Sequence, residues 1–325
     1  MDISVRTKER FCKDCNIPLR LFHEPYFMDR LKLYDKFYGT IEKWNLFVEE
    51  LQKYHCEQDY FEEYNRVKDS AINCIKNSLA YQKFNNEDMN LYKIKNDLPN
   101  KDIFKTDNDN KLFISIDMKK ANFSVLQYYG DTIGRSMFAG APTWEDFIGL
   151  FTTNKHIINS KYIRQVILGN CNPSRHITYE KYIMNEILED IIKMIYERFK
   201  VVFFSNDEIV IDVTGEYKTI SEIELLDDTF ESLRLYTIND AKVPLKIELF
   251  SLHKIHGADG YYKRSFNERG EESIEFKCMD NFILPFVLRK FLNEEVTEND
   301  KVFYHEGLLA KFIETPNISI TGGIV

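Results

Sequence analysis

No stretch of this 325-residue sequence approaches the roughly 18 consecutive apolar residues that a membrane-spanning helix needs. Residues Met1–Arg10 alternate in charge and contain no apolar segment, so they do not resemble a secretion signal. Cysteine is scarce, and the six that occur are scattered, which favours a reducing compartment over a disulfide framework. We therefore expect a protein of the cytoplasm, of a cell or of an infected cell, without a membrane partner.

Basic residues are also in the minority, because 43 lysines and arginines stand against 52 aspartates and glutamates, a net charge of -9. This balance disfavours a broad nucleic-acid-binding surface, since clustered Lys and Arg make the phosphate contacts. A local basic groove remains compatible with an acidic protein. Internal repeats and long low-complexity segments are absent. The hydrophobic content of 44% is sufficient for a packed core and excludes wholesale disorder.

Local patterns divide the chain into four predicted regions. The first is helical, because apolar residues such as Trp44, Phe47 and Leu51 recur at the spacing of one helix face. The second is rich in Asn, Asp and Lys and is predicted to be a polar linker. The third alternates between strands and helices, and the fourth is a C-terminal extension that offers a place for protein partners. In order, they span residues 1–84, 85–110, 111–255 and 256–325.

Two aspartates stand beside apolar strands. Leu112–Ile116 is a short apolar run that predicts a buried strand ending at Asp117. Residues 201–211 predict a β-hairpin with Asp207 at its turn, and a predicted helix over residues 179–199 precedes it. Two carboxylates on neighbouring strands can hold two divalent ions about 3.5–4 Å apart, which activate a hydroxyl and stabilise a leaving oxygen. Their spacing alone favours the interpretation that they are ordinary turn residues.

Three segments, taken in order, resemble the catalytic motifs of family A DNA polymerases. Ser115–Asp131 is similar to the first motif, in which an aspartate ends a strand, a helix follows and a Gly-Asp pair closes it. Phe203–Ile211 is similar to the hairpin with the second catalytic aspartate, although Asn206 replaces the family's usual histidine. Val243–Glu248 resembles a strand near the family's C-terminus. The resemblance covers residues 111–252.

The resemblance implies an α+β fold with an antiparallel polymerase-type palm sheet, a helical, thumb-like N-terminal region and reduced fingers. It also implies metal-dependent nucleotidyl transfer to a 3′-hydroxyl, with Mg²⁺ or Mn²⁺, nucleoside triphosphates and a primer–template. Asp117 and Asp207 would be the catalytic, metal-binding carboxylates. Glu208 is a further catalytic candidate, although alternation along a strand predicts that its side chain points away from that of Asp207.

The substrate-binding candidates follow from departures from the family pattern. Asp117 and Asp207 are close in sequence for this family, so the fingers are expected to be abbreviated. Lys161 and Arg164 lie three residues apart and, on one helical face, could hold a triphosphate; a solvated face explains them equally well. Arg175 is a further candidate.

Asn122 bears on the choice of sugar. The family usually has a glutamate at this position, five residues after the first aspartate, whose bulk excludes a 2′-hydroxyl. The asparagine is shorter, and its amide can donate a hydrogen bond to a ribose hydroxyl. We therefore expect tolerance of ribonucleotides, unless the reduced fingers move the nucleotide away from Asn122.

Other interpretations stay open. The same palm is compatible with a primase-like or terminal-transferase activity. A catalytically inactive, palm-derived subunit of a replication or virion assembly, binding nucleic acid or serving a structural role, is the alternative that the acidic charge favours. Cys12 and Cys15 form a Cys-x-x-Cys pair, but such a pair without a clear second one is a weak indication of zinc.

Overall fold

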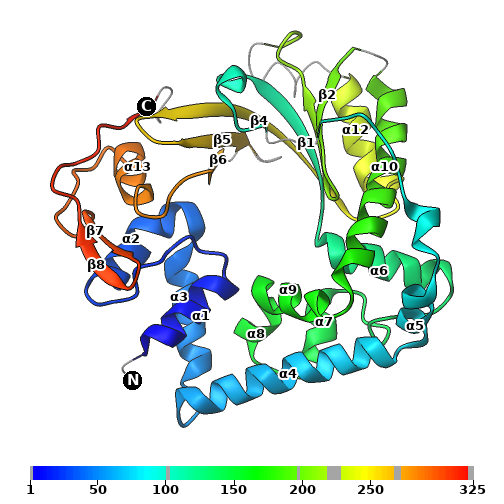
Figure 1. Ribbon diagram of the computed structural model, residues 1–325, viewed down its shortest axis with the longest axis horizontal. Coiled ribbons are helices and arrows are strands. Elements are labelled where there is room, and N and C mark those ends of the chain that lie inside the picture. The colour runs from blue at the N-terminus through cyan, green and yellow to red at the C-terminus, as the bar shows by residue number, and fades with distance from the viewer. Residues whose placement is uncertain (1–2, 100–102, 196–197, 218–227, 267–271, 321–325) are drawn as a thin grey trace.

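The computed structural model describes residues 3–99, 103–195, 198–217, 228–266 and 272–320. Within them the chain has a mixed α+β architecture, in which an antiparallel sheet crosses one side of the molecule and helices form most of the rest (Figure 1). The α+β class expected from the sequence is confirmed. In the part of the chain that is described, no helix combines the length and the apolar character needed to cross a membrane.

The N-terminal region consists of packed helices, which confirms the helical pattern in its sequence. Ser78 separates two of them and caps the second, because its hydroxyl accepts a hydrogen bond from Tyr81 N at 3.1 Å. Aromatic rings fill the space between the helices; those of Phe11 and Trp44 lie 4.9 Å apart, edge to face. The helices are α1 (Val5–Asp14), α2 (Tyr26–Tyr38), α3 (Thr40–Leu51), α4 (Glu57–Asn77) and α5 (Leu79–Asn86).

The polar segment before the first strand contains two short 3₁₀ helices, η1 (Met89–Tyr92) and η2 (Thr106–Asn108). Backbone hydrogen bonds fasten this segment to the sheet. Phe204 N donates to Pro99 O at 3.0 Å, and Asn110 N donates to Leu252 O at 2.8 Å. The segment is therefore held against the strands at two points.

The strands form one antiparallel sheet in the order β2-β3-β1-β4-β5-β6, and the short β9 pairs with β4. The predicted strand at 112–116 and the predicted hairpin are confirmed, and the strand after Pro244 continues to His256. β5 and β6 extend the same sheet beyond residue 256. The bounds are β1 (Leu112–Met118), β2 (Lys200–Phe204), β3 (Glu208–Asp212), β4 (Leu245–His256), β5 (Gly260–Phe266), β6 (Glu272–Lys277) and β9 (Ser319–Ile320).

Helices cover one face of this sheet. Ile116 and Met118 of β1 belong to the large core that includes α6 and α10, and Tyr262 of β5 packs with α13. Because side chains alternate along a strand, the intervening residues of β1 lie on the other face. That face has a small apolar cluster, in which the rings of Phe113 and Phe250 lie 5.4 Å apart. The covering helices are α6 (Ala121–Thr132), α10 (Pro173–Ile195), α12 (Asp228–Asn239) and α13 (Leu284–Phe291).

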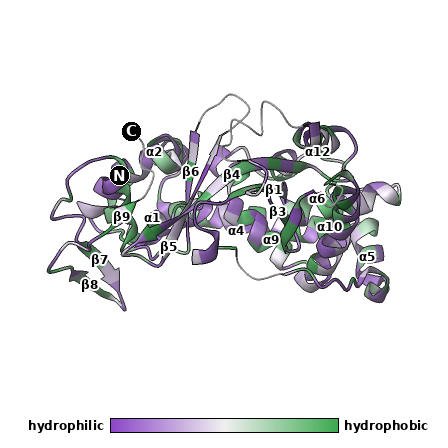
Figure 2. Ribbon diagram, turned by 90° about the horizontal axis from the view of Figure 1, so that it is seen from above, coloured by the Kyte–Doolittle hydropathy of each residue, from purple (hydrophilic) through white to green (hydrophobic). Residues whose placement is uncertain are grey.

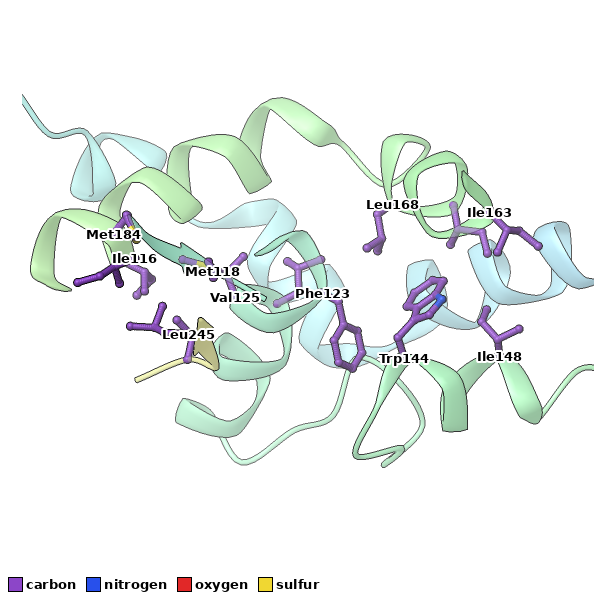
Figure 3. Packing of buried hydrophobic residues seen from close by; sticks show 14 of the residues in the cluster. Ile116, Met118, Phe123, Val125, Trp144, Ile148, Ile163, Leu168, Met184 and Leu245 are labelled. Carbon is purple, nitrogen blue, oxygen red and sulfur yellow. The ribbon is translucent and has the colours of Figure 1, made fainter. Parts of the chain in front are cut away.

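Three short helices between α6 and α10 continue the core away from the sheet (Figure 3). Met118 and Phe123 lead from the sheet and α6 toward Trp144, whose ring lies 5.9 Å from that of Phe123. Ile163 and Leu168 pack on the far side of Trp144 (Figure 3). The helices are α7 (Trp144–Gly149), α8 (Lys155–Asn159) and α9 (Lys161–Gly169).

Two buried polar clusters join the N-terminal helices to later parts of the chain. Asp14 accepts a hydrogen bond from Ser160 Oγ at 2.7 Å and lies 3.1 Å from His156 Nε2. Arg30 donates to Asp300 Oδ1 at 2.6 Å, beside the hairpin of β7 (Val302–His305) and β8 (Leu308–Lys311). These contacts bring late parts of the chain back to the N-terminal helices, so that the ribbon in Figure 1 forms a closed ring. Figure 2 shows the β7–β8 hairpin and both termini at one end of the molecule, with α10 and α12 at the other.

Candidate active site at the ends of β1 and β3

Asp117 is positioned by strands on both sides. It is directly opposite Glu208 of β3 and Lys246 of β4 in the antiparallel register. Directly opposed residues project from the same face of a sheet, so these three side chains form a row across the sheet. The neighbours of Asp117 in the chain, Ile116 and Met118, are buried on the helix-covered face, which leaves Asp117 on the other one.

Glu208 shares the face of Asp117. Its Oε1 accepts a hydrogen bond from Ser115 Oγ at 2.6 Å, and Ser115 is two residues before Asp117 on the same strand face. The strand alternation used to orient Glu208 relative to Asp207 does not apply, because Asp207 lies in the turn and β3 begins at Glu208. The side chain of Glu208 therefore lies beside that of Asp117 on one face of the sheet, which the sequence did not predict.

Asp207 is exposed in the turn between β2 and β3. Its backbone carbonyl accepts a hydrogen bond from Met118 N at 2.8 Å, which holds the turn beside the end of β1. Its carboxylate accepts a hydrogen bond from Ser205 Oγ at 3.0 Å. The two aspartates chosen from the sequence are therefore on adjacent segments, as the hairpin predicts.

Glu208 and Asp207 act electrostatically on Asp117. Burial, reinforced by the negative charges of Glu208 and Asp207, raises the pKa of Asp117 to about 6. Lys246 and Lys263 oppose this rise but do not cancel it. The end of β1 thus carries negative charge that its own lysines compensate only in part.

The sequence did not predict the charged network that lies beside Asp117. Glu248 of β4 accepts hydrogen bonds from Lys263 Nζ at 3.0 Å and from Lys246 Nζ at 3.2 Å. Burial alone would raise the pKa of Glu248, but the two lysines and the hydroxyl of Ser265 hold it at about 2. Glu248 therefore stays ionised and fixes Lys246 next to Asp117. Only the alternation in residues 245–250 hinted at this arrangement.

Glu180 is a second acid that the sequence analysis missed. It is buried on α10, where burial and the charge of Asp207 raise its pKa to about 7. The helix pattern around it indicated only an apolar face, because a single acid in a helix carries no signal of its neighbours.

The predicted substrate-binding residues are dispersed. Asn122 lies half-buried in the first turn of α6, and its Oδ1 accepts a hydrogen bond from Phe123 N at 3.0 Å. Lys161 and Arg164 are both on α9, where Lys161 is exposed and Arg164 is half-buried. Arg175, on α10, donates from Nη2 to the carbonyl oxygen of Phe84 at 2.7 Å.

The surroundings of the two arginines differ. Arg164 Nε is buried without a hydrogen-bond partner among the described residues, and burial lowers its pKa despite the charge of Glu145. Glu145 forms an ion pair with Lys120, three residues after Asp117. Arg175 also donates to Glu87 O at 2.6 Å, so it fastens the chain that follows α5. Among the described residues Arg164 Nε thus has no hydrogen-bond partner, whereas Arg175 is occupied by backbone carbonyls.

Within the described residues, no group of three or more His, Cys, Asp or Glu side chains is placed to hold a metal ion. The carboxylates at the end of β1 and the start of β3 are oxygen donors of the kind that Mg²⁺ takes, since it is commonly held by one or two carboxylates, waters and substrate phosphates. The partly uncompensated charge at Asp117 suits a cation in this place.

Cys12 and Cys15 offer a poorer metal site. Cys12 is buried at the end of α1, and burial raises the pKa of both thiols, that of Cys15 to about 12. Zinc requires thiolates, which such an environment disfavours.

In comparisons with known proteins, no protein-family model and no curated protein matches the sequence.

Proposed function

We propose that this chain is a metal-dependent nucleotidyltransferase of the DNA polymerase A type, built on a palm-like sheet. It would add nucleotides to a 3′-hydroxyl, with a primer–template and nucleoside triphosphates as partners. Asp117 and Asp207 would hold Mg²⁺ or Mn²⁺, which lowers the barrier by stabilising charge on the transferring phosphoryl group. Glu208 orients the cluster from the strand next to Asp117.

The observation that carries the proposal is the row of acids where β1 ends and β3 begins. Asp117 faces Glu208 directly, and the backbone of Asp207 is bonded to the residue after Asp117. The pKa of Asp117 is raised by burial and by the charges of Glu208 and Asp207, and such shifts are typical of functional sites. The order of strand, helix and acidic hairpin supports the same assignment.

Primer extension with Mg²⁺ or Mn²⁺ tests the proposal. Asp117→Ala and Asp207→Ala should each lower the rate by about 10²–10³-fold or more, the effect of removing one preorganised electrostatic group. Asp240→Ala removes an exposed acid after α12 and should leave the rate unchanged. Activity in either site variant equal to that of the wild type would refute the assignment.

Metal binding provides an independent readout. A ligand that binds only the folded state raises the melting temperature. Mn²⁺ should therefore raise the melting temperature of the wild type and of Asp240→Ala, but not that of Asp117→Ala. Equal shifts in all three proteins would place the metal elsewhere.

A catalytically inactive nucleic-acid-binding or structural subunit is the second candidate function. The absence of a three-ligand group among the described residues, together with the net charge of -9, favours it. Binding of primer–template without extension, unchanged in Asp117→Ala, would select this function.

The cytoplasm is the compartment we propose for either function. The six cysteines, all within the described residues, form no disulfide, in agreement with a reducing environment.

A further inference from the structure

A cavity of about 320 Å³ lies at the end of β1 and β3 that is distant from Asp117. Its described lining includes Lys111, which precedes β1, and Asp212, the last residue of β3. At about 3.3 Å per residue, the six residues from Lys111 to Asp117 span about 20 Å. The cavity is therefore separate from the candidate active site, and it does not depend on the function proposed there.

Three lysines from three different segments line this cavity. Lys105 comes from the polar segment, Lys111 directly precedes β1, and Lys200 is the first residue of β2. Lys111 Nζ lies 3.7 Å from Asp212 Oδ2, an acid that also lines the cavity. Lys200 is opposite Asp212 in the strand register, but the structure pairs that carboxylate with Lys111.

This concentration of positive charge is unusual in so acidic a chain. The described lining holds three lysines and one aspartate, whereas the whole sequence has a net charge of -9. Both Lys105 and Lys200 are exposed, and neither forms an ion pair with a described carboxylate. Like charges held near one another repel, and a bound anion would relieve that repulsion.

The remaining described lining of the cavity is mostly apolar and consists of Pro99, Ile103, Val202 and Asn108. Ile103 is buried and Val202 is half-buried in the cluster that covers Phe113. Asn108 Nδ2 donates to Ile103 O at 2.8 Å, and Pro99 O accepts the hydrogen bond from β2 described above. Ligand sites are commonly preformed hollows of about 300–1,000 Å³ with apolar walls and a few convergent polar groups.

We propose that this cavity binds a nucleoside polyphosphate. Lysines from three segments fit a row of phosphates better than a single carboxylate, because each phosphate group can accept from a separate ammonium group. Lys105, Lys111 and Lys200 would contact the phosphates, and the base would pack against Ile103 and Val202. The cavity would thus be a second nucleotide site, remote from Asp117.

Titration calorimetry with ATP at low salt and without divalent ions tests the proposal. Lys105→Ala and Lys200→Ala should each weaken ATP binding about tenfold, the loss of one charge-assisted contact. Lys36→Ala removes an exposed lysine on α2 and should not change the affinity. Asp117→Ala should also bind ATP as the wild type does, which separates this site from the proposed active site.

The apolar wall has its own test. Val202→Ser should weaken ATP binding but not the binding of inorganic tripolyphosphate, which has no base. Adenosine should not bind measurably, because it lacks the phosphates.

Four results would overturn the proposal. They are no ATP binding, ATP binding unchanged in the Lys105→Ala/Lys200→Ala double variant, tripolyphosphate bound as tightly as ATP, and a 5′-phosphorylated oligonucleotide bound more tightly than ATP. The last result would assign the cavity to the end of a nucleic-acid strand. Because both lysines are exposed, melting temperatures of the variants should match that of the wild type and verify their folding.

Discussion

At the scale of single residues, the protonation of Asp117 depends more on its surroundings than on its being an aspartate. Burial and two neighbouring acids raise its pKa to about 6, while Lys246 and Lys263 limit the rise. An isolated aspartate would be ionised at neutral pH without cost. Here ionisation costs free energy, which links the protonation of this side chain to the stability of the fold.

The pH dependence of stability follows from this shift. The pKa of Asp117 in the folded protein exceeds the value of about 3.9 in an unfolded chain, so its contribution favours folding below pH 4 and is lost as the pH rises through 6. Asp117→Asn should raise the free energy of unfolding by about 1–2 kcal/mol at pH 7.5 and have little effect at pH 4. Urea denaturation in EDTA measures both values.

The matched control for this prediction is Asp240→Asn, which changes an exposed acid. The same gain for Asp117→Asn at pH 4 and pH 7.5 would contradict the link to protonation. Glu180, whose pKa burial and Asp207 raise to about 7, should add a further loss of stability between about pH 4.5 and 7. Glu180→Gln should remove that part of the pH dependence.

Asn122 gives a prediction about sugar choice that depends on the proposed function. Its amide lies in the first turn of α6, five residues after Asp117, with Oδ1 turned back to Phe123 N. The amide group is then free to donate to a 2′-hydroxyl. Discrimination against ribonucleotides should be well below the 10⁴–10⁵-fold that a hydroxyl-reading site can reach.

Single-nucleotide incorporation with paired ribo- and deoxyribonucleoside triphosphates measures this discrimination. Asn122→Glu introduces the residue that is usual in family A DNA polymerases and should increase the preference for deoxyribonucleotides. A strong preference in the wild type, unchanged in Asn122→Ala, would rule the idea out.

At the scale of elements, the junction after α6 depends on close backbone contact. The sequence predicts that Gly130 ends the helix, but α6 continues to Thr132. Gly130 O accepts a hydrogen bond from Arg135 N at 2.8 Å, and a Cβ on Gly130 would lie 2.5 Å from Arg135 O. Glycine is needed at this position because the backbone of Arg135 lies too close to leave room for a Cβ, and not because the helix ends there.

Gly130→Ala should therefore destabilise the protein by about 1–3 kcal/mol, the usual cost of overpacking. Gly149→Ala is the control, because a Cβ there meets nothing within 4 Å and the residue is helical. That change should be neutral or slightly stabilising. Thermal unfolding of the two variants compares them, and equal melting temperatures would show that the contact near Arg135 relaxes freely.

At the scale of the whole molecule, Arg30 joins the N-terminal helices to the C-terminal region. It donates to Asp300 Oδ1 at 2.6 Å and to the carbonyl oxygens of Asn299, Asp300 and Val302. Both charged side chains are almost fully buried. The region after β6 is thus anchored to the body of the molecule by a charge pair as well as by apolar packing.

Without Arg30, Asp300 keeps Arg289 as a charged partner, because Arg289 Nε donates to Asp300 Oδ2 at 2.9 Å. The expected cost is therefore that of lost charged hydrogen bonds, about 1.5–3 kcal/mol, and not that of a fully uncompensated buried charge. Arg30→Met should lower the free energy of unfolding by about this amount and expose residues after 280 to proteolysis. Lys193→Met breaks the exposed pair with Asp190 and should cost less than about 1 kcal/mol. Similar costs for the two variants would show that the Arg30 pair is not desolvated.

Much of the architecture around the site could be predicted from the sequence, since its signals are local. Apolar runs predict β1 and the β2–β3 hairpin, and they place Asp117 and Asp207 at strand ends. β5 and β6 were not predicted, because their polar and charged residues, such as Lys263 and Lys277, obscure the alternation. Those strands form because β4 supplies an edge for them.

The sequence by itself determined which acids stand at strand ends, because apolar periodicity acts over a few neighbouring residues. Only the tertiary structure decided that Glu208 faces Asp117, that Glu248 fixes Lys246 beside it, and that Arg175 is occupied by backbone carbonyls. These outcomes depend on strand register and on contacts between distant segments. A one-residue slip in register would turn every side chain of a strand to the opposite face, so no local pattern encodes them.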